Sequence, residues 1–199
     1  MTETSRVLAV PPDPDRLEHE LFTVMPLTPE LVDLDLEAYL ASPRVIATHS
    51  AGRWPVEGFT RENDLALLEQ HAADHRAGRA FTYLLLDPAG KRSLGCVYLN
   101  PLRDYLVRVG AAAPTLTAYA AGRTAMVTFW IREDRDAELS APVAAAVHDW
   151  LRSAWRLVGH LFRVLSDERA SVAALGALGL EGLELALPAE PRPYRWFAG

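Results

Sequence analysis

Two short runs of β-branched and aromatic residues constrain the fold of this chain more than any other feature. Residues 94–101 read LGCVYLNP, and residues 125–133 read AMVTFWIRE. Runs of this kind are typical of strands. The second run ends in charged residues, and apolar residues at helical spacing follow it over 143–158. The pattern predicts a fold that combines a sheet with helices.

The remaining elements follow from the same periodicities. Helices are predicted at about 29–41, 61–77, 141–157 and 168–178. Strands are predicted at about 21–25, 80–86, 93–99, 105–109, 125–131, 161–165 and 183–187. Residues 42–59 and 110–122 read as irregular, the latter as a flexible excursion with an extra hairpin. Two early helices and an antiparallel run in the middle predict a mixed α/β sheet, mostly antiparallel and flanked by helices.

Composition limits the classes of protein to consider. The 199 residues fit a single domain over 21–199, preceded by an arm over 1–20 in which Pro11-Pro-Asp-Pro14 prevents regular structure. A net charge of −6 without a basic tract argues against nucleic acid as a partner. The single cysteine, Cys96, forms no internal disulfide, and no apolar stretch approaches 18 residues. With no signal peptide apparent, we expect a cytoplasmic protein that does not bind membranes.

Several local patterns, in this order along the chain, resemble the GNAT superfamily of N-acetyltransferases over about residues 21–187. They are Phe22–Leu27 followed by TPEL, Trp54-Pro55 followed by Phe59-Thr60, the pair 81–84 and 94–98, and Ser171 followed by LGL at 178–180. The resemblance implies a central sheet that is splayed open between the strands at about 125–133 and 161–165. It also implies acetyl-CoA as the cofactor.

The glycine-rich pyrophosphate loop of that family is missing here. The family's loop has the pattern Gln/Arg-x-x-Gly-x-Gly/Ala, whereas residues 134–143 read DRDAELSAPV. Backbone N–H groups of such a loop hold phosphate, and Pro142 removes one of them. The acidic side chains would also repel phosphate, so we expect weak binding of acetyl-CoA. The resemblance assigns cofactor contacts to Phe129, Ile131, Arg132, Arg135 and Ser140, with Ser140 capping the following helix.

The resemblance also suggests where an acceptor amine would react. A carboxylate near the central strand often accepts the proton of the amine, which makes Glu133 the candidate base; the alternative is a solvated charge at a strand end. Where many members have a tyrosine as general acid, this chain has Leu175. The candidate substrate pocket consists of Trp54, Tyr83, Tyr98 and Trp130, although each aromatic side chain could instead fill the core. Trp54, in a loop with His49, would act as a lid or fix the loop.

Other reactive residue types have simpler interpretations. His71 and His75 are four residues apart on a predicted helix, but they lack the glutamate of a zinc-protease motif and are expected on a solvated face. Cys96 lies in the middle of a strand and is expected to be a small buried residue, not a nucleophile. We predict no metal site and find no pattern of a Ser-His-Asp or Cys-His enzyme.

Two functions remain open from the sequence. The first is an acetyl-CoA-dependent N-acetyltransferase that acts on a small amine or a protein N-terminus, in which direct attack by a neutral amine opens the thioester. The second is a GNAT-fold protein that has lost acetyl transfer and serves as a binding or interaction module. A homodimer is also possible in principle, with residues 101–124 and the aromatic C-terminal tail as contact surfaces.

Overall fold

The structure, a computed structural model, describes residues 7–119 and 122–199. Within these ranges eight strands form one sheet in the order β1-β2-β3-β4-β5-β6-β8-β7. The strands are β1 (Leu17–His19), β2 (Phe22–Pro26), β3 (Phe81–Leu86), β4 (Ser93–Pro101), β5 (Thr124–Ile131), β6 (Gly159–Leu165), β7 (Glu181–Leu183) and β8 (Tyr194–Ala198). The helices are α1 (Val32–Leu40), α2 (Pro43–His49), α3 (Arg61–Arg76), α4 (Leu102–Arg108), α5 (Ala113–Tyr119), α6 (Asp136–Ser153) and α7 (Arg169–Ala177).

The pairing of the strands confirms the predicted mixed, mostly antiparallel sheet. Every neighbouring pair is antiparallel except β5 and β6, which run parallel. The β5–β6 ladder joins residues 124–127 to residues 159–162 and then stops. Beyond Val127 and Phe162 the two strands diverge, which leaves the predicted V-shaped opening in the sheet.

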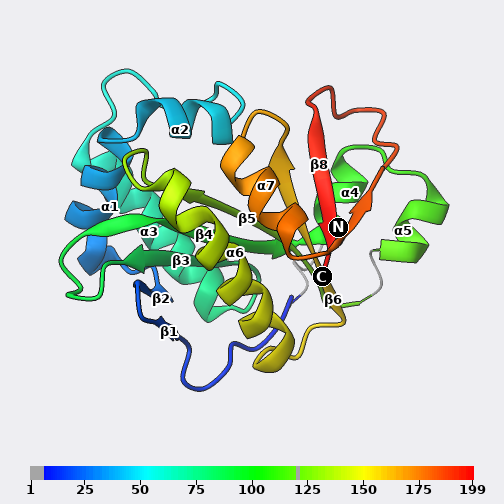
Figure 1. Cartoon of the computed structure of the whole chain (residues 1–199), viewed down its shortest axis with the longest axis horizontal. Coiled ribbons are helices and arrows are strands. Elements are labelled where there is room, and N and C mark those ends of the chain that lie inside the picture. The colour runs from blue at the N-terminus through cyan, green and yellow to red at the C-terminus, as the bar shows by residue number, and fades with distance from the viewer. Residues whose placement is uncertain (1–6, 120–121) are drawn as a thin grey trace.

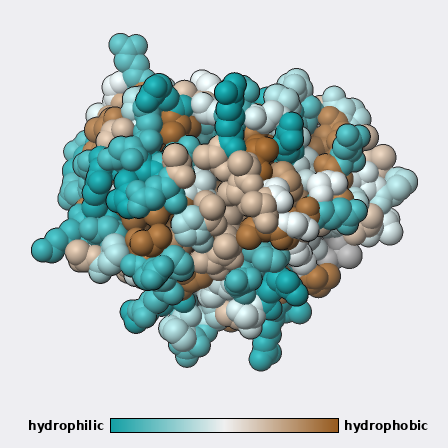
Figure 2. All heavy atoms as spheres, in the orientation of Figure 1, coloured by the Kyte–Doolittle hydropathy of each residue, from teal (hydrophilic) through white to brown (hydrophobic). Residues whose placement is uncertain are grey.

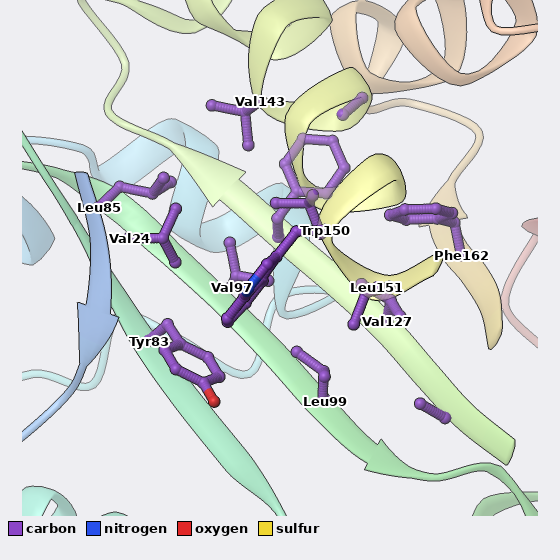
Figure 3. Packing of buried hydrophobic residues seen from close by; sticks show 14 of the residues in the cluster. Val24, Tyr83, Leu85, Val97, Leu99, Val127, Val143, Trp150, Leu151 and Phe162 are labelled. Carbon is purple, nitrogen blue, oxygen red and sulfur yellow. The ribbon is translucent and has the colours of Figure 1, made fainter. Parts of the chain in front are cut away.

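Helices cover both faces of the sheet. Figure 1 shows α6 crossing the near face of the central strands, with α3 on the far face. Figure 3 shows Trp150 and Leu151 of α6 beside Val97 of β4 and Val127 of β5, all within the largest buried cluster. A second buried cluster joins α1, α2 and α3 to the opposite face of β3, β4 and β5. Because side chains alternate along a strand, each central strand contributes to both clusters.

Local sequence explains where the main elements begin and bend. The side chain of Thr60 accepts a hydrogen bond from the backbone of Asn63, and the Asn63 side chain accepts one from the Thr60 backbone, so a capping box starts α3. Gly95 of β4 has φ +138°, and a Cβ there would lie 2.0 Å from the carbonyl oxygen of Trp130. Only glycine fits this close approach of β4 to β5.

Three segments predicted to be irregular or extended contain helices. The strand expected at 105–109 is wrong, because Leu102, Tyr105, Leu106 and Val109 follow helical spacing and are buried on one side of α4. The excursion after it contains α5 in place of a hairpin, and residues 120–121 of that excursion lie outside the described ranges. Pro43 at the first helical position begins α2 inside the segment expected to be irregular.

The start of α6 also differs from the prediction. The helix begins at Asp136 and not near residue 141, so Ser140 is not its N-cap. The Oγ of Ser140 instead donates to Oδ1 of Asp136 at 2.8 Å, and Pro142 lies inside the helix. The first turn therefore carries the carboxylates of Asp136 and Glu138.

The C-terminal residues form part of the sheet. The strand expected at 183–187 is limited to β7, and the expected tail contains β8, which pairs with β6 through Trp196 and Phe197. Gly199 follows β8, and its amide donates to the carbonyl of His160 at 3.0 Å. The imidazoles of His148 on α6 and His160 on β6 are buried there, with Nδ1 and Nε2 3.1 Å apart.

The described part of the N-terminal segment packs against the domain. Residues 7–16 contain no helix or strand, but Leu8 and Ala9 are buried, and the amide of Leu8 donates to the carbonyl of Gly78 at 2.7 Å. Residues 17–19 form β1 and extend the sheet, while residues 1–6 of the expected arm lie outside the described ranges. Within residues 7–119 and 122–199, no helix is both long and apolar enough to cross a membrane.

Candidate functional site

Two cavities meet at the indole of Trp130. The first, which we call the aromatic cavity, has a volume of about 270 Å³ and lies between α1, α2, α3 and one face of β4 and β5. The second, the splay cleft, has a volume of about 430 Å³ and lies at the diverging ends of β5 and β6. Trp130 lines both. The Trp130 side chain is therefore shared by two spaces that two reactants could occupy.

Five aromatic rings line the aromatic cavity: Tyr39, Trp54, Phe59, Tyr98 and Trp130. The Trp130 indole N–H donates to the Tyr98 hydroxyl oxygen at 3.1 Å, which fixes both rings. Trp54 meets Phe59 edge to face, with centroids 5.2 Å apart. The Trp54 amide donates to Ser50 Oγ at 2.9 Å, so its loop is also anchored. Three of the four predicted pocket residues are thus brought together.

The fourth predicted pocket residue, Tyr83, belongs to the core on the other face of the sheet. It is fully buried and meets Trp150 of α6 edge to face at 5.2 Å (Figure 3). Its hydroxyl donates to Asp15 Oδ1 at 2.7 Å, and burial together with this carboxylate raises the pKa of Tyr83. The prediction failed because Tyr83 and Tyr98 occupy strand positions that point to opposite faces.

Two carboxyl groups, Asp35 of α1 and Asp64 of α3, line the aromatic cavity. The thiol of Cys96, buried as predicted, donates to Asp35 Oδ1 at 3.3 Å. Asp64 is 3% exposed, and its Oδ2 has no hydrogen-bond donor among the described residues. Burial, followed by the nearby charge of Asp35, raises the pKa of Asp64 to about 7. Burial also raises the pKa of Asp35, so the site disfavours ionisation of both carboxyl groups at once.

Neither aspartate was predicted as a site residue, although the sequence contains a signal for both. Asp64 lies four residues before Leu68 and eight before Ala72, on the buried side of α3. Asp35 lies three residues before the buried Ala38 of α1. An acidic residue at an apolar position of a helix must be paired, protonated or functional.

Histidines complete the wall of the aromatic cavity. His49, at the end of α2, has Nδ1 2.7 Å from Glu168 Oε1. His71 has Nδ1 3.1 Å from Thr82 Oγ1, and burial lowers its pKa. The expected solvated face is therefore wrong for His71 and also for His75, whose Nε2 lies 2.7 Å from an Asp15 oxygen. Among the described residues, no group of three His, Cys, Asp or Glu side chains could hold a metal ion.

The splay cleft has an acidic lining. Glu133, Asp136, Asp167 and Glu168 face two basic residues, Arg44 and Arg169. Glu133 accepts hydrogen bonds from the amide of Arg44 at 3.1 Å and from its guanidinium. The Arg44 side chain is the main cause that lowers the pKa of Glu133. This carboxylate lines the cleft and not the aromatic cavity, and its lowered pKa makes it a weak proton acceptor.

The residues expected to support a pyrophosphate are engaged elsewhere. Arg132 is 6% exposed and donates twice to the Glu37 carboxylate, at 2.5 and 2.7 Å, with Asp134 3.2 Å from its Nε. Arg135 pairs with Glu138 in the first turn of α6 at 2.8 Å. Phe129 and Ile131 direct their side chains into the core, while their backbone lies where β5 has left β6. That free edge can pair with an extended ligand.

Arg169 is a basic residue of the cleft that the sequence analysis did not single out. It is exposed at the start of α7, and its side chain makes no ion pair within the described ranges. In Figure 2 the surface over α6 and α7 has a weakly hydrophobic centre bounded by hydrophilic side chains. Arg169 is therefore the guanidinium of the splay cleft that an anionic group of a ligand could contact.

Comparison with solved structures identifies the fold. A ribosomal-protein-S5-alanine acetyltransferase from Vibrio fischeri is 15% identical at a TM-score of 0.66, over 92% of this chain and 95% of that one. RimJ from Mycobacterium smegmatis, in complex with CoA-disulfide, is 15% identical at a TM-score of 0.67, over 94% and 87%. RimL, a ribosomal L7/L12 α-N-protein acetyltransferase in complex with coenzyme A, is 13% identical at a TM-score of 0.64, over 91% and 94%.

The chain has the GNAT fold. No protein-family model matches the sequence, and no curated protein matches it. The GNAT architecture was thus predictable from the order of elements, although sequence identity with these structures is low. The splay cleft lies where β5 and β6 diverge.

Proposed function

We propose that the protein is an N-acetyltransferase that uses acetyl-CoA in the splay cleft and a primary amine in the aromatic cavity. The observation that carries this proposal is the position of Trp130, which lines both spaces. An acyl transfer between two bound molecules needs two adjoining sites with the reacting atoms brought together. RimJ and RimL, which share the fold, have been solved with forms of coenzyme A bound.

The cleft fits one part of the cofactor better than the other. The free backbone edge of β5 at Phe129 and Ile131 suits the extended pantetheine arm, and Arg169 could contact a phosphate. The first turn of α6 offers Asp136 and Glu138 where a pyrophosphate would need N–H donors. When bound, acetyl-CoA supplies a thioester-activated acetyl group. This chain's own residues hold the amine, accept its proton and exclude water.

An acetyl-transfer assay with matched variants tests the proposal. The protein is incubated with acetyl-CoA and either small primary amines or peptides with a free N-terminus, and acetylated products are measured by mass spectrometry. Trp130→Leu should abolish transfer, whereas Trp155→Leu removes a buried indole from the opposite face and should retain it. The absence of acetylation for every amine, or equal losses in the two variants, would contradict the proposal.

A second function is favoured by the acidity of the splay cleft. Four carboxylates face two guanidiniums there, and one of the latter is already paired with Glu133. Such a cleft would suit a GNAT-fold protein that binds a partner without transferring an acetyl group. Calorimetric titration with coenzyme A separates the two functions. Binding in the micromolar range that weakens about tenfold in Arg169→Ala supports the transferase, and no binding at millimolar coenzyme A supports the binding protein.

A further inference from the structure

We propose that the aromatic cavity binds a primary ammonium group carried by an apolar substituent, and that the Asp35–Asp64 pair is the group that recognises it. This inference rests on the proposed function in one respect: the ammonium ligand is taken to be the acceptor of the acetyl group. The charges, the unpaired Asp64 oxygen and the aromatic rings of the cavity carry it.

The charge inside the cavity is uncompensated. Its lining contains two carboxyl groups and neither a lysine nor an arginine. Asp64 Oδ2 is buried without a hydrogen-bond donor in the described part of the chain, an arrangement that carries a desolvation cost. The nearby histidines do not remove this cost, because His49 is bonded to Glu168 and His71 to Thr82. A ligand with N–H donors and a positive charge would supply what the carboxylate lacks.

The walls of the cavity favour a cation over a neutral polar group. Aromatic faces attract ammonium groups, and the attraction grows when the site is desolvated. Trp54, Tyr98 and Trp130 are held in place by hydrogen bonds or ring contacts, so the cavity is already formed without a ligand. An anionic ligand would meet two carboxyl groups and gain nothing from the rings. The site therefore selects amines that carry an alkyl or aryl group and no acidic group.

The same aspartates can prepare the amine for reaction. An ammonium group has no lone pair, so one N–H bond must break before nitrogen can attack a carbonyl carbon. The Asp64 carboxylate can accept that proton by forming an O–H bond, and the electron pair of the broken bond stays on nitrogen. A pKa of about 7 for Asp64 suits this exchange near neutral pH.

The test measures amine binding in the absence of acetyl-CoA. The full chain is titrated calorimetrically with 2-phenylethylamine and with 2-phenylethanol, which has nearly the same shape but no charge. We expect the amine to bind at least tenfold more tightly than the alcohol. Asp64→Asn should weaken amine binding roughly 10- to 100-fold and leave the alcohol unchanged. Glu69→Gln, which removes an exposed charge from the same helix, should have no effect.

Two peptide ligands distinguish the source of the ammonium group. A tripeptide amide with phenylalanine at its free N-terminus is compared with its N-acetylated form. If the free peptide binds as tightly as 2-phenylethylamine, the natural ligand is a protein N-terminus. If only 2-phenylethylamine binds, the natural ligand is a small free amine. Both results support an ammonium site.

Several results would overturn the inference. They are equal affinity of the wild-type protein for amine and alcohol, no binding of either amine source at millimolar concentration, or unchanged amine affinity in a folded Asp64→Asn variant. The comparison of amine with alcohol needs no variant, so it holds even if that variant fails to fold. Because acetyl-CoA is absent, a protein that binds amines but transfers no acetyl group would refute the proposed function and retain this inference.

Discussion

The buried pair His148 and His160 predicts a loss of stability in mild acid. The two imidazoles are 8% and 3% exposed, and Gly199 after β8 lies against both. Burial, followed by the charges of His148 and Arg152, lowers the pKa of His160 from 6.5 to about 4. The unfolded chain therefore takes up a proton on His160 below pH 6.5, whereas the folded protein does so only near pH 4.

The size of the effect follows from these two pKa values. The stabilisation due to neutral His160 is fully present above pH 6.5 and is lost as the pH falls toward 4. Because the unfolded chain takes up a proton at pH 5 and the folded protein does not, the free energy of unfolding at pH 5 is lower by about 2 kcal/mol. Stabilities of small domains are about 5–15 kcal/mol, so this loss is readily measured.

Urea denaturation at pH 7.5 and pH 5 checks the prediction in the wild-type protein and in His160→Leu. The variant loses the bond to His148 at both pH values but does not take up a proton at residue 160. Its stability relative to the wild type should therefore improve by about 2 kcal/mol between pH 7.5 and pH 5. Titration of the carboxylates affects both proteins and cancels in the comparison. Parallel pH profiles for the two proteins would refute the reasoning.

Three further predictions concern the site. Asp64→Asn should stabilise the protein in denaturation assays, increasingly as the pH rises from about 4 to about 7 and by at most about 4 kcal/mol above pH 7, because the raised pKa of Asp64 marks a cost of ionisation in the folded state; equal stabilities at pH 8 would contradict this. Arg132→Met should cost about 1–3 kcal/mol of stability, since it removes both hydrogen bonds to Glu37 while Asp134 keeps its ion pair with Arg92, and should leave the Kd for coenzyme A unchanged. A tenfold weaker Kd at unchanged stability would restore its sequence-based role at the pyrophosphate. Glu133→Gln should alter turnover less than threefold, because Arg44 lowers the pKa of Glu133, and a fall of about 10²–10⁴ in steady-state rate would instead identify it as the base.

The sheet and its opening could be predicted because they depend on local patterns. The runs at 81–86 and 93–101 flank the turn residues 87–90, as a hairpin requires, and the polar cap at Thr60 marks α3. The segment at 102–108 was misassigned because its residues also fit a short strand, and only the buried spacing of Leu102, Tyr105 and Leu106 decides for a helix.

The site was harder to predict because its groups come from distant segments. The positions of Trp54, Tyr98 and Trp130 in a loop and on central strands were enough to predict that they line the pocket. The face of the sheet to which Tyr83 points depends on strand register, which the sequence does not give. The engagement of Arg132 depends on Glu37, 95 positions away in the chain, which no local pattern reveals. Asp35 and Asp64 each looked like an ordinary charged residue of a helix, and only the packing of α1 beside α3 makes them a pair.

The order of strands at the C-terminal side makes the last strand of the chain an internal strand of the sheet. β7 precedes β8 in the chain, yet it joins the sheet only through β8, which lies between β6 and β7. Without Tyr194–Ala198 in place, the outer edge of β6 would present unpaired N–H and C=O groups. The last strand of the chain therefore completes the edge of β6 and also attaches β7 to the sheet. A chain cut between residues 184 and 193 would retain β8 only if its pairing with β6 can form without the covalent link.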